Sequence, residues 1–348
     1  MDYETYMHRC IALAKLGAGN VAPNPMVGAV LVYNDIIIGE GFHQHYGQSH
    51  AEVNCINSVE NFNLDLIEKA TLYVSLEPCA HFGKTPPCAD LIIQYKIKNV
   101  VIACRDSFEA VDGKGIEKLK AAGIHVTIGV LENEALELNK RFFTFHSKRR
   151  PYIILKWAQT NNNKIAHSGN ERLLISNEIS NRAVHKWRTE EAAILVGTNT
   201  AMQDNPSLTA RFWQGKNPVR LVIDTALKLP NHLHLLDDQV KTIIFNYQKE
   251  SQHNNTFYCK VFNDKSLIAQ IADRLFQLNI NSVLVEGGAQ VLQSFINENY
   301  WDEARVITNI DLQIEVGIEA PQLANSVPVS TQKILADRID HYKNLQSL

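Results

Sequence analysis

Short apolar runs rich in valine and isoleucine alternate with helix-like patterns along most of this chain. Up to residue 148, strand-like runs cover 28–33, 36–38, 71–76, 100–104 and 125–128, and helix-like stretches cover 2–16, 50–58, 88–95, 115–122 and 132–145. From residue 152 onward, strand-like runs recur at 152–155, 193–196, 219–223, 242–245, 282–285 and 305–308, with helix-like stretches at 177–188, 267–278 and 289–297. This alternation predicts the α/β class, in which helices pack in layers on a sheet.

The two alternating regions are separated by the basic cluster Lys148-Arg149-Arg150, which ends at Pro151. A length of 348 residues also favours two domains, since domains average about 150 residues. Polar segments that end in proline are typical of domain boundaries, and a basic cluster this short is more often a solvated linker than a nucleic-acid-binding patch. We therefore expect one domain over residues 1–148 and another over residues 149–348.

Composition and charge limit the kinds of molecule that we expect this protein to bind. A hydrophobic content of 45% is ordinary for a globular chain, and a net charge of −3 lacks the cationic excess that nucleic-acid and membrane binders usually need. The first residues are acidic rather than signal-like, and no apolar run approaches the ~18 residues of a membrane span. We expect a cytoplasmic protein that acts on a small molecule and binds neither nucleic acid nor membrane.

The six cysteines are too few and too scattered for a disulfide framework in a chain of this length. Free cysteines are usually small buried hydrophobic residues, and we assign no role beyond packing to Cys10, Cys55, Cys104 and Cys259. Cys79 and Cys88 differ from the other four cysteines, because the residues around them suggest a chemical role beyond packing.

One candidate metal site combines His50 with these two cysteines. His50-Ala51-Glu52 opens a predicted helix, and Pro78-Cys79 follows a predicted strand, with Cys88 nine residues later. One imidazole and two thiolates suit a catalytic zinc ion, which keeps its fourth position for water and lowers the pKa of that water towards ~7. Glu52 is then placed to move protons between the water and a leaving amine, the role of the glutamate in zinc nucleobase deaminases. On spacing alone, a buried cysteine pair beside a surface histidine stays an open alternative.

Several motifs together resemble the bifunctional deaminase/reductase family of riboflavin biosynthesis. They are Asn24-Pro25-Met26-Val27-Gly28, Gly41-Phe42-His43, His50-Ala51-Glu52, the run from Glu77 to Cys88 and the run from Asp106 to Gly115. The eight residues between the two cysteines distinguish this family from cytidine and transfer-RNA adenosine deaminases. The resemblance implies a cytidine-deaminase-like three-layer α/β/α domain followed by a dihydrofolate-reductase-like α/β domain.

The resemblance also implies the first reaction and its residues. Zinc bound by His50, Cys79 and Cys88, with Glu52 as proton shuttle, would deaminate 2,5-diamino-6-ribosylamino-4(3H)-pyrimidinone 5′-phosphate at C2. Substrate contacts fall on Asn24, His43, His81, Lys84 and Thr85. These groups suit a polar ring that carries a phosphate. Simpler interpretations stay open, because Asn24 precedes a proline in a turn and Lys84 could be solvated.

The second half has no Gly-x-Gly-x-x-Gly fingerprint, but a strand, a glycine pair and a helix follow one another at 282–291. Such a turn lets a pyrophosphate approach the backbone and free helix N–H groups, although a glycine pair is often only a tight turn. By resemblance this half reduces the ribosyl chain to ribityl with NADPH. The implied cofactor contacts are Lys156, Ala158, Leu174, Thr200, Asp204, Thr225, Gly287, Gly288, Ala289 and Gln290, and the implied substrate contacts are Arg172, Arg188, Leu208, Arg211 and Glu286. The arginines also have a simpler interpretation, as solvated residues in exposed ion pairs.

This half departs from the family pattern in two places. Asn162 and Asn163 stand where the family usually has Asp-Gly, and Arg172 and Leu174 replace a serine and a tryptophan. Asparagine tolerates the left-handed backbone, so we expect the turn at Asn163 to survive. These changes put reductase efficiency in doubt.

Three hypotheses follow from these motifs. The leading one is an enzyme that catalyses both steps as a homodimer or larger homo-oligomer through its reductase domain. The second is an active deaminase whose other domain serves binding or dimerisation. The third, a nucleic-acid base deaminase, is disfavoured by the weak charge and the long cysteine spacer.

Overall fold

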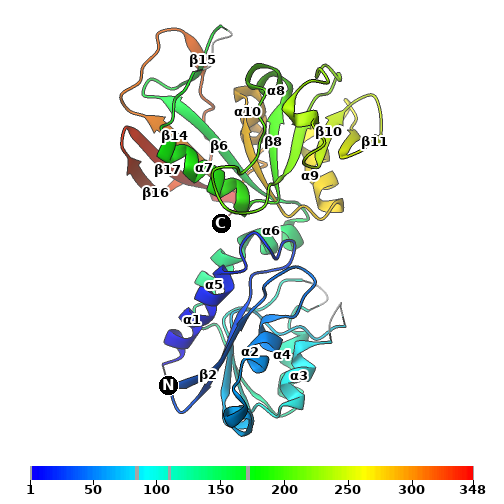
Figure 1. Cartoon of the computed structure of the whole chain (residues 1–348), viewed down its shortest axis with the longest axis vertical. Coiled ribbons are helices and arrows are strands. Elements are labelled where there is room, and N and C mark those ends of the chain that lie inside the picture. The colour runs from blue at the N-terminus through cyan, green and yellow to red at the C-terminus, as the bar shows by residue number, and fades with distance from the viewer. Residues whose placement is uncertain (1, 83–85, 109–110, 170–172, 348) are drawn as a thin grey trace. The chain divides into compact units, whose positions relative to one another are not determined.

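The protein is described by a computed structural model that covers residues 2–82, 86–108, 111–169 and 173–347. The chain divides into two units, Met1–Arg149 and Arg150–Leu348 (Figure 1). Both are α/β, which confirms the predicted class.

The first unit is built on a five-stranded sheet with the order β2-β1-β3-β4-β5. The strands are β1 (Gly28–Tyr33), β2 (Ile36–Phe42), β3 (Thr71–Val74), β4 (Asn99–Ile102) and β5 (His125–Ile128). β1 pairs antiparallel with β2 and β3, whereas β3, β4 and β5 run parallel. The carboxyl ends of β3 and β4 therefore meet at one edge of this sheet.

Helices cover both faces of this sheet and make three layers. Alternate side chains of β1 enter different cores: Ala29 and Leu31 pack on one face, and Val30 and Val32 on the other. The first face carries α2 (Ala51–Asn57), α3 (Cys88–Gln94) and α4 (Lys114–Ala121), and the second carries α1 (Tyr3–Lys15) and α5 (Glu132–Leu138). A 3-10 segment, η1 (Asn61–Lys69), leads into β3.

The single closing helix predicted over 132–145 is wrong, because the chain forms α5 and α6 (Lys140–Lys148) with a break at Asn139. The Asn139 side chain accepts a hydrogen bond from Met26 N (2.8 Å) and donates one to Met26 O (2.9 Å). Asn139 is buried and its backbone leaves the helical region at φ −105°, ψ 21°. The periodicity of the apolar residues does not reveal this long-range contact.

The second unit has a ten-stranded sheet with the order β11-β12-β10-β9-β8-β13-β6-β14-β17-β16. Seven neighbouring strands are parallel, from β12 (Thr256–Lys260) through β10 (Thr242–Asn246), β9 (Val219–Ile223), β8 (Ala193–Gly197), β13 (Ser282–Gly287) and β6 (Tyr152–Thr160) to β14 (Glu303–Asn309). Antiparallel strands β11 (Ser251–His253), β17 (Asp337–Asn344) and β16 (Ser326–Ile334) complete it. A separate ribbon joins β7 (Lys164–His167) to β15 (Gly317–Glu319).

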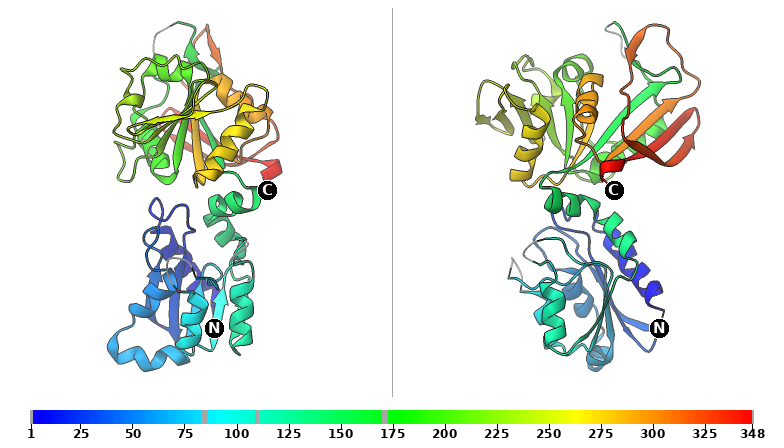
Figure 2. Two further views of the ribbon diagram at one scale, coloured as in Figure 1. Left: turned by 90° about the vertical axis from the view of Figure 1, so that its right-hand side faces the viewer. Right: turned by 180° about the vertical axis from the view of Figure 1, so that it is seen from behind.

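Helices cover both faces of the parallel part of this sheet. α9 (Leu267–Gln277) and α10 (Ala289–Asn297), yellow to orange in Figure 2, pack on the larger core. α7 (Glu178–Glu190) and α8 (Thr198–Asp204) contribute to smaller apolar clusters on the opposite face of the sheet. The strand side chains in these clusters point away from the larger core. Short 3-10 turns lie at η2 (His234–Leu236) and η3 (Leu345–Ser347).

The hairpin of β16 and β17 has no counterpart in the predicted elements. Most of β16 is exposed, so it lacks the apolar alternation that predicts a strand. Its turn is Leu335-Ala336, with Leu335 at φ 54°, rather than an Asn-Gly or Asp-Gly pair. Neither sequence signal for a hairpin is therefore present.

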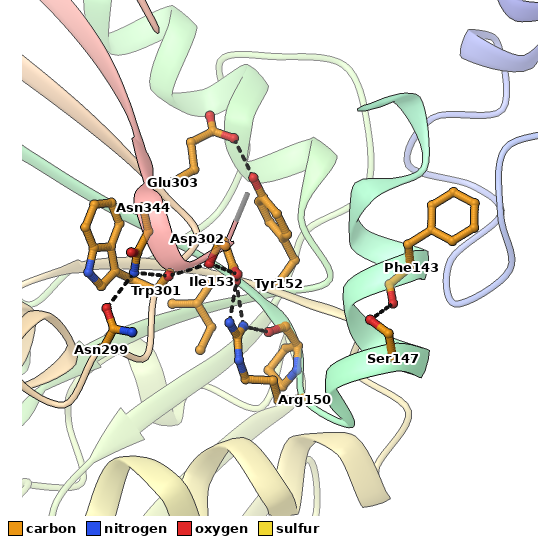
Figure 3. A network of polar contacts seen from close by, with 12 residues as sticks. Phe143, Ser147, Arg150, Tyr152, Ile153, Asn299, Trp301, Asp302, Glu303 and Asn344 are labelled. Atoms are coloured by element: carbon orange, nitrogen blue, oxygen red, sulfur yellow. Dashed lines mark hydrogen bonds and ion pairs between the residues drawn. The ribbon is translucent and has the colours of Figure 1, made fainter. Parts of the chain in front are cut away.

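One residue of the basic cluster between the predicted domains, Arg150, is part of a polar network (Figure 3). Its guanidinium donates to both carboxylate oxygens of Asp302, at 2.6 and 2.7 Å, and its side chain is only 13% exposed. Asp302 also accepts hydrogen bonds from Ile153 N and Ser347 Oγ. This carboxylate joins the start, the middle and the end of the second unit. The expected solvated linker therefore fits the exposed Lys148 and Arg149 but not Arg150.

Among the described residues, no helix is both long enough and apolar enough to cross a membrane.

Candidate metal centre and cofactor site

Three predicted ligands converge at the ends of elements in the first unit. His50 is the N-cap residue of α2, Cys79 follows β3, and Cys88 is the first residue of α3. His50 Nδ1 lies 3.6 Å from Cys79 Sγ and 3.4 Å from Cys88 Sγ, and one potential ligand atom from each residue lies within 4.8 Å of the others. Cys88 N donates to Cys79 Sγ at 3.3 Å, so the start of α3 faces a thiolate.

These distances fit zinc. Zn–S bonds of about 2.3 Å and Zn–N bonds of about 2.0–2.1 Å place tetrahedral ligand atoms roughly 3.5–3.8 Å apart. The separations from His50 Nδ1 match that spacing to within about 0.1 Å. A set of one imidazole and two thiolates is also the donor chemistry of a catalytic zinc site with one open position.

The two thiols show why a cation belongs here. Hydrogen bonding from Cys88, with a further contribution from His50, lowers the pKa of Cys79 to about 4. The Cys79 thiolate and burial in turn raise the pKa of Cys88 well above its usual value. Two neighbouring thiols therefore ionise together only beside a positive charge, and metal binding supplies that charge.

Glu52 lies on the first turn of α2 and is buried, with 3% of its surface exposed. Burial raises the pKa of this carboxyl group, and its side chain hydrogen-bonds with Cys88. It is therefore a carboxyl group beside the ligand set that is shielded from bulk water. This position suits proton transfer.

Two of the predicted substrate residues lie together next to His50. Asn24 Nδ2 lies 3.3 Å from His43 Nε2, and the rings of His43 and His50 are 5.5 Å apart. His43 Nδ1 is 3.0 Å from Ser49 O, so Nδ1 carries the proton and Nε2 accepts from the Asn24 amide. Burial lowers the pKa of His43, which favours this neutral form.

Of the remaining predicted deaminase residues, His81 is described by the structure and follows Cys79 by two positions. His81 is exposed, and its ring centroid is 6.0 Å from that of Phe108. Phe108 in turn packs on His146, a contact that the sequence motifs do not indicate. Lys84 and Thr85 lie outside the described residues.

In the second unit, several predicted residues lie near the carboxyl ends of parallel strands, where α/β sheets bind ligands. Thr200 follows β8, Thr225 follows β9, and Gly287-Gly288 links β13 to α10. Gly288 N donates to Thr200 Oγ1 at 2.9 Å, and a Cβ on Gly288 would lie 3.1 Å from that oxygen. Ala289 and Gln290 form the first turn of α10, whose N–H groups have no partners within the helix. This turn fits the pyrophosphate of a dinucleotide such as NADPH.

A buried charge cluster lies beside this turn. Arg188 donates to both oxygens of Glu286, at 2.8 and 2.7 Å, and to Thr209 O at 3.0 Å. Lys156 Nζ is 3.9 Å from Glu286 Oε2. Burial alone would raise the pKa of Glu286, but Arg188 and Lys156 outweigh it and lower that pKa to about 2. Burial lowers the pKa of Lys156.

The other predicted residues of this unit have varied surroundings. Ala158 is half-buried on β6, and Asp204 is exposed at the end of α8. Leu208 is buried in the left-handed conformation at φ 49°, and Arg211 is exposed over the ring of Phe212. Leu174 is 75% exposed, and Arg172 lies outside the described residues.

The turn that departs from the family pattern is intact. Asn163 adopts φ 58°, as predicted from its tolerance of the left-handed region. Asn162 Nδ2 donates to Ile314 O at 2.7 Å, while its Oδ1 accepts from Thr160 Oγ1 and Ile314 N. The amide therefore makes a bond that an aspartate could not make.

Comparisons with known proteins agree with this geometry. Residues 1–104 match the "Cytidine and deoxycytidylate deaminase zinc-binding region" family, and residues 151–309 match the "RibD C-terminal domain" family. The chain is 41% identical to riboflavin biosynthesis protein RibD of Aquifex aeolicus (strain VF5) over 308 residues, which covers 86% of this chain and 84% of that protein. It is also 41% identical to RibD of Bacillus amyloliquefaciens over 309 residues, covering 86% and 82%.

Two solved structures are similar over nearly the whole chain. One is a diaminohydroxyphosphoribosylaminopyrimidine deaminase/5-amino-6-(5-phosphoribosylamino)uracil reductase from Thermotoga maritima, with a TM-score of 0.90, 36% identity and coverage of 98% of both chains. The other is RibD of Acinetobacter baumannii, with a TM-score of 0.88, 29% identity and coverage of 98% of both chains.

Proposed function

The chain belongs to the RibD family, the bifunctional deaminase/reductases of riboflavin biosynthesis, and we propose that its two units act in turn on one pyrimidine nucleotide. It is a zinc-dependent deaminase joined to an NADPH-dependent reductase. We assign the deaminase to residues 1–148 and the reductase to residues 149–348. The substrate that this arrangement supports is 2,5-diamino-6-ribosylamino-4(3H)-pyrimidinone 5′-phosphate.

In the deaminase, His50, Cys79 and Cys88 would hold zinc. When bound, zinc supplies the Lewis acidity that lets water ionise near neutral pH. Glu52 accepts a proton from the water that attacks C2 and delivers a proton to the departing amine. A carbon–oxygen bond forms at C2, the bond to the exocyclic nitrogen breaks, and ammonia leaves.

Substrate binding in the deaminase falls to Asn24, His43, His81, Lys84 and Thr85. Asn24 and neutral His43 present amide and imidazole groups beside His50, which suits the polar edge of a pyrimidine. The ammonium of Lys84 and the hydroxyl of Thr85 suit the phosphate.

In the reductase, NADPH supplies the hydride that C1′ of the ribosyl chain receives. We place the cofactor along Lys156, Ala158, Leu174, Thr200, Asp204, Thr225 and the turn from Gly287 to Gln290. Arg172, Arg188, Leu208, Arg211 and Glu286 are the proposed substrate residues. The rigid Arg188–Glu286 pair keeps two charged groups oriented at the strand ends, and Arg211 offers an exposed guanidinium for phosphate.

The observation that carries the deaminase assignment is the convergence of His50, Cys79 and Cys88 beside buried Glu52. A coupled assay tests both steps: ammonia release and NADPH oxidation are followed with the diaminopyrimidine phosphate as substrate. Glu52→Gln should stop ammonia release but leave reduction of the deaminated nucleotide intact. Arg188→Ala should stop that reduction but leave ammonia release intact. Ammonia release without NADPH oxidation in the unsubstituted enzyme would instead indicate a binding or dimerisation role for the second unit.

We further propose a cytoplasmic enzyme with no nucleic-acid or membrane partner, which assembles as a homodimer or larger oligomer through its reductase unit. The net charge of −3 supports small-molecule rather than nucleic-acid binding. Light scattering on the intact chain and on residues 149–348 tests the assembly, and a monomer in either sample contradicts it.

A further inference from the structure

Glu77 is a buried carboxylate that accepts four backbone hydrogen bonds. Its Oε2 accepts from Asp106 N (3.2 Å) and Gly113 N (3.0 Å), and its Oε1 accepts from Gly115 N (3.0 Å) and Ile116 N (3.1 Å). Only 4% of the residue is exposed. Each oxygen therefore has two donors, which uses the full capacity of an ionised carboxylate.

The four donors belong to the segment that follows β4 and to the beginning of α4. Gly113 is the N-cap residue of α4, has φ 85° and carries no side chain that could cap the helix. Glu77 does this from another element, and a carboxylate at a helix N-terminus also interacts favourably with the helix dipole. The start of α4 is thus attached to the residue two positions before a metal ligand.

A second contact joins the same segments. A Cβ on Gly115 would lie 1.9 Å from Pro78 O, so the first turn of α4 packs directly on the backbone between Glu77 and Cys79. Any side chain at residue 115 would push α4 and this turn apart. Glycine is required here by close approach, since its φ lies outside the left-handed range.

These contacts constrain the position of the Cys79 thiolate. Only Pro78 separates Glu77 from Cys79, and its ring fixes φ. On the other side, Glu77 N donates to Cys104 O at 3.0 Å, so the residue is held through both its backbone and its side chain. The Cys79 sulfur extends from this fixed turn to its positions near His50 Nδ1 and Cys88 N.

We propose that Glu77 is a positioning residue of the metal centre: by binding the start of α4, it holds the Pro78-Cys79 turn where Cys79 completes the ligand set. This inference rests on the proposed ligands His50, Cys79 and Cys88. A purely structural cap would stabilise α4 without affecting zinc affinity, and that difference makes the proposal testable.

Glu77→Gln is the sharpest probe, because it keeps the size of the side chain. In this variant, the side-chain NH₂ group takes the place of one carboxylate oxygen. Two backbone N–H groups would then face a donor instead of an acceptor. We expect zinc affinity to fall about 10–100-fold, the usual effect of removing a group that orients a metal ligand. Gly115→Ala disturbs the same turn while retaining the carboxylate, and we expect the same direction of change.

The experiment uses the full chain loaded with zinc or cobalt. Chelator competition measures zinc affinity, and the visible spectrum of the cobalt-substituted protein reports thiolate coordination geometry. Ile11→Ala is the matched control: it removes a buried side chain from the opposite face of the sheet, so it should lower the melting temperature and leave zinc affinity unchanged. All four tryptophans lie beyond residue 150, so their fluorescence checks that the second unit is folded in every variant.

The possible outcomes test the positioning role of Glu77 separately from the assignment of the zinc ligands. Zinc affinity of Glu77→Gln within twofold of the unsubstituted protein, with an unchanged cobalt spectrum, overturns the positioning role. If Glu77→Gln does not fold, Gly115→Ala decides in the same way. Retention of zinc by Cys79→Ser overturns the ligand assignment instead, whatever Glu77 does.

Discussion

At the scale of single residues, Glu52 combines its proposed role in proton transfer with a buried position that keeps out bulk water. Glu52→Gln removes the only group assigned to move protons while it preserves size, and we expect the rate of ammonia release to fall about 10²–10⁴-fold. Unchanged zinc content, measured by atomic absorption, would locate this loss in proton transfer.

The matched control for this variant is Glu68→Gln, an exposed glutamate of the same unit. It should deaminate at the unsubstituted rate. A Glu52→Gln enzyme with more than a tenth of normal deaminase activity would contradict the assignment.

We expect His185 to make the stability of the second unit depend on pH. It is buried beside Arg188 and Arg211, and burial together with these charges lowers its pKa to about 4. As the pH falls from about 6.5 to 4, the unfolded chain binds a proton at this site that the folded chain does not, so stability falls over that range. The melting temperature of the His185→Phe variant should fall less between pH 6.5 and 4 than that of the unsubstituted protein.

Tryptophan fluorescence during heating measures this difference. His253→Gln, which replaces an exposed histidine, should follow the unsubstituted protein across the range. Parallel pH profiles for His185→Phe and the unsubstituted protein would show that His185 titrates normally in the folded state.

At the scale of elements, the break between α5 and α6 depends on one side chain. Asn139→Ala removes both hydrogen bonds to Met26 and leaves a backbone donor and acceptor without these partners. We expect a loss of about 2–3 kcal/mol in the unfolding free energy of the first unit, from urea denaturation followed by circular dichroism. Asn133→Ala, an exposed change within α5, should cost less than about 0.5 kcal/mol, and equal losses in the two variants would contradict the role of Asn139.

At the turn between β6 and β7, we expect the residue that is usual in the family to be unfavourable. Asn162→Asp restores the residue usual in the family, but an aspartate cannot donate to Ile314 O. Because this turn is exposed, we expect a loss of about 0.5–1.5 kcal/mol in the stability of the second unit, measured by tryptophan fluorescence in urea. Asn161→Asp on the same exposed turn is the control, and a stabilising Asn162→Asp would refute this explanation.

At the scale of the whole molecule, each unit has its own ligand, so the two can be stabilised separately. Removing zinc with a chelator should lower the melting transition of the first unit, and NADPH at about 100 times its dissociation constant should stabilise the second by about 2.7 kcal/mol. Circular dichroism reports both units, while tryptophan fluorescence reports the second alone. A tryptophan transition that responds to zinc removal but not to NADPH would contradict this independence.

Much of the architecture follows from local patterns. The predicted strand at 219–223 and helix at 289–297 agree with β9 and α10 in their bounds, because each has an apolar periodicity of the right kind. The β16–β17 hairpin and the break at Asn139 do not follow from such patterns, because solvent exposure removes the apolar signal from one and a contact over 113 residues causes the other.

The sequence by itself determined the α/β class and the residue types of the proposed metal site, because periodicity and the His-x-Glu and Pro-Cys motifs are local. Only the tertiary structure decided what holds those residues in place. Four backbone donors reach Glu77 from up to 39 residues away, and Arg150 meets Asp302 across 152 residues. Side chains that satisfy buried backbone groups of distant segments have no periodic signal in the sequence, since their partners are defined by the fold alone.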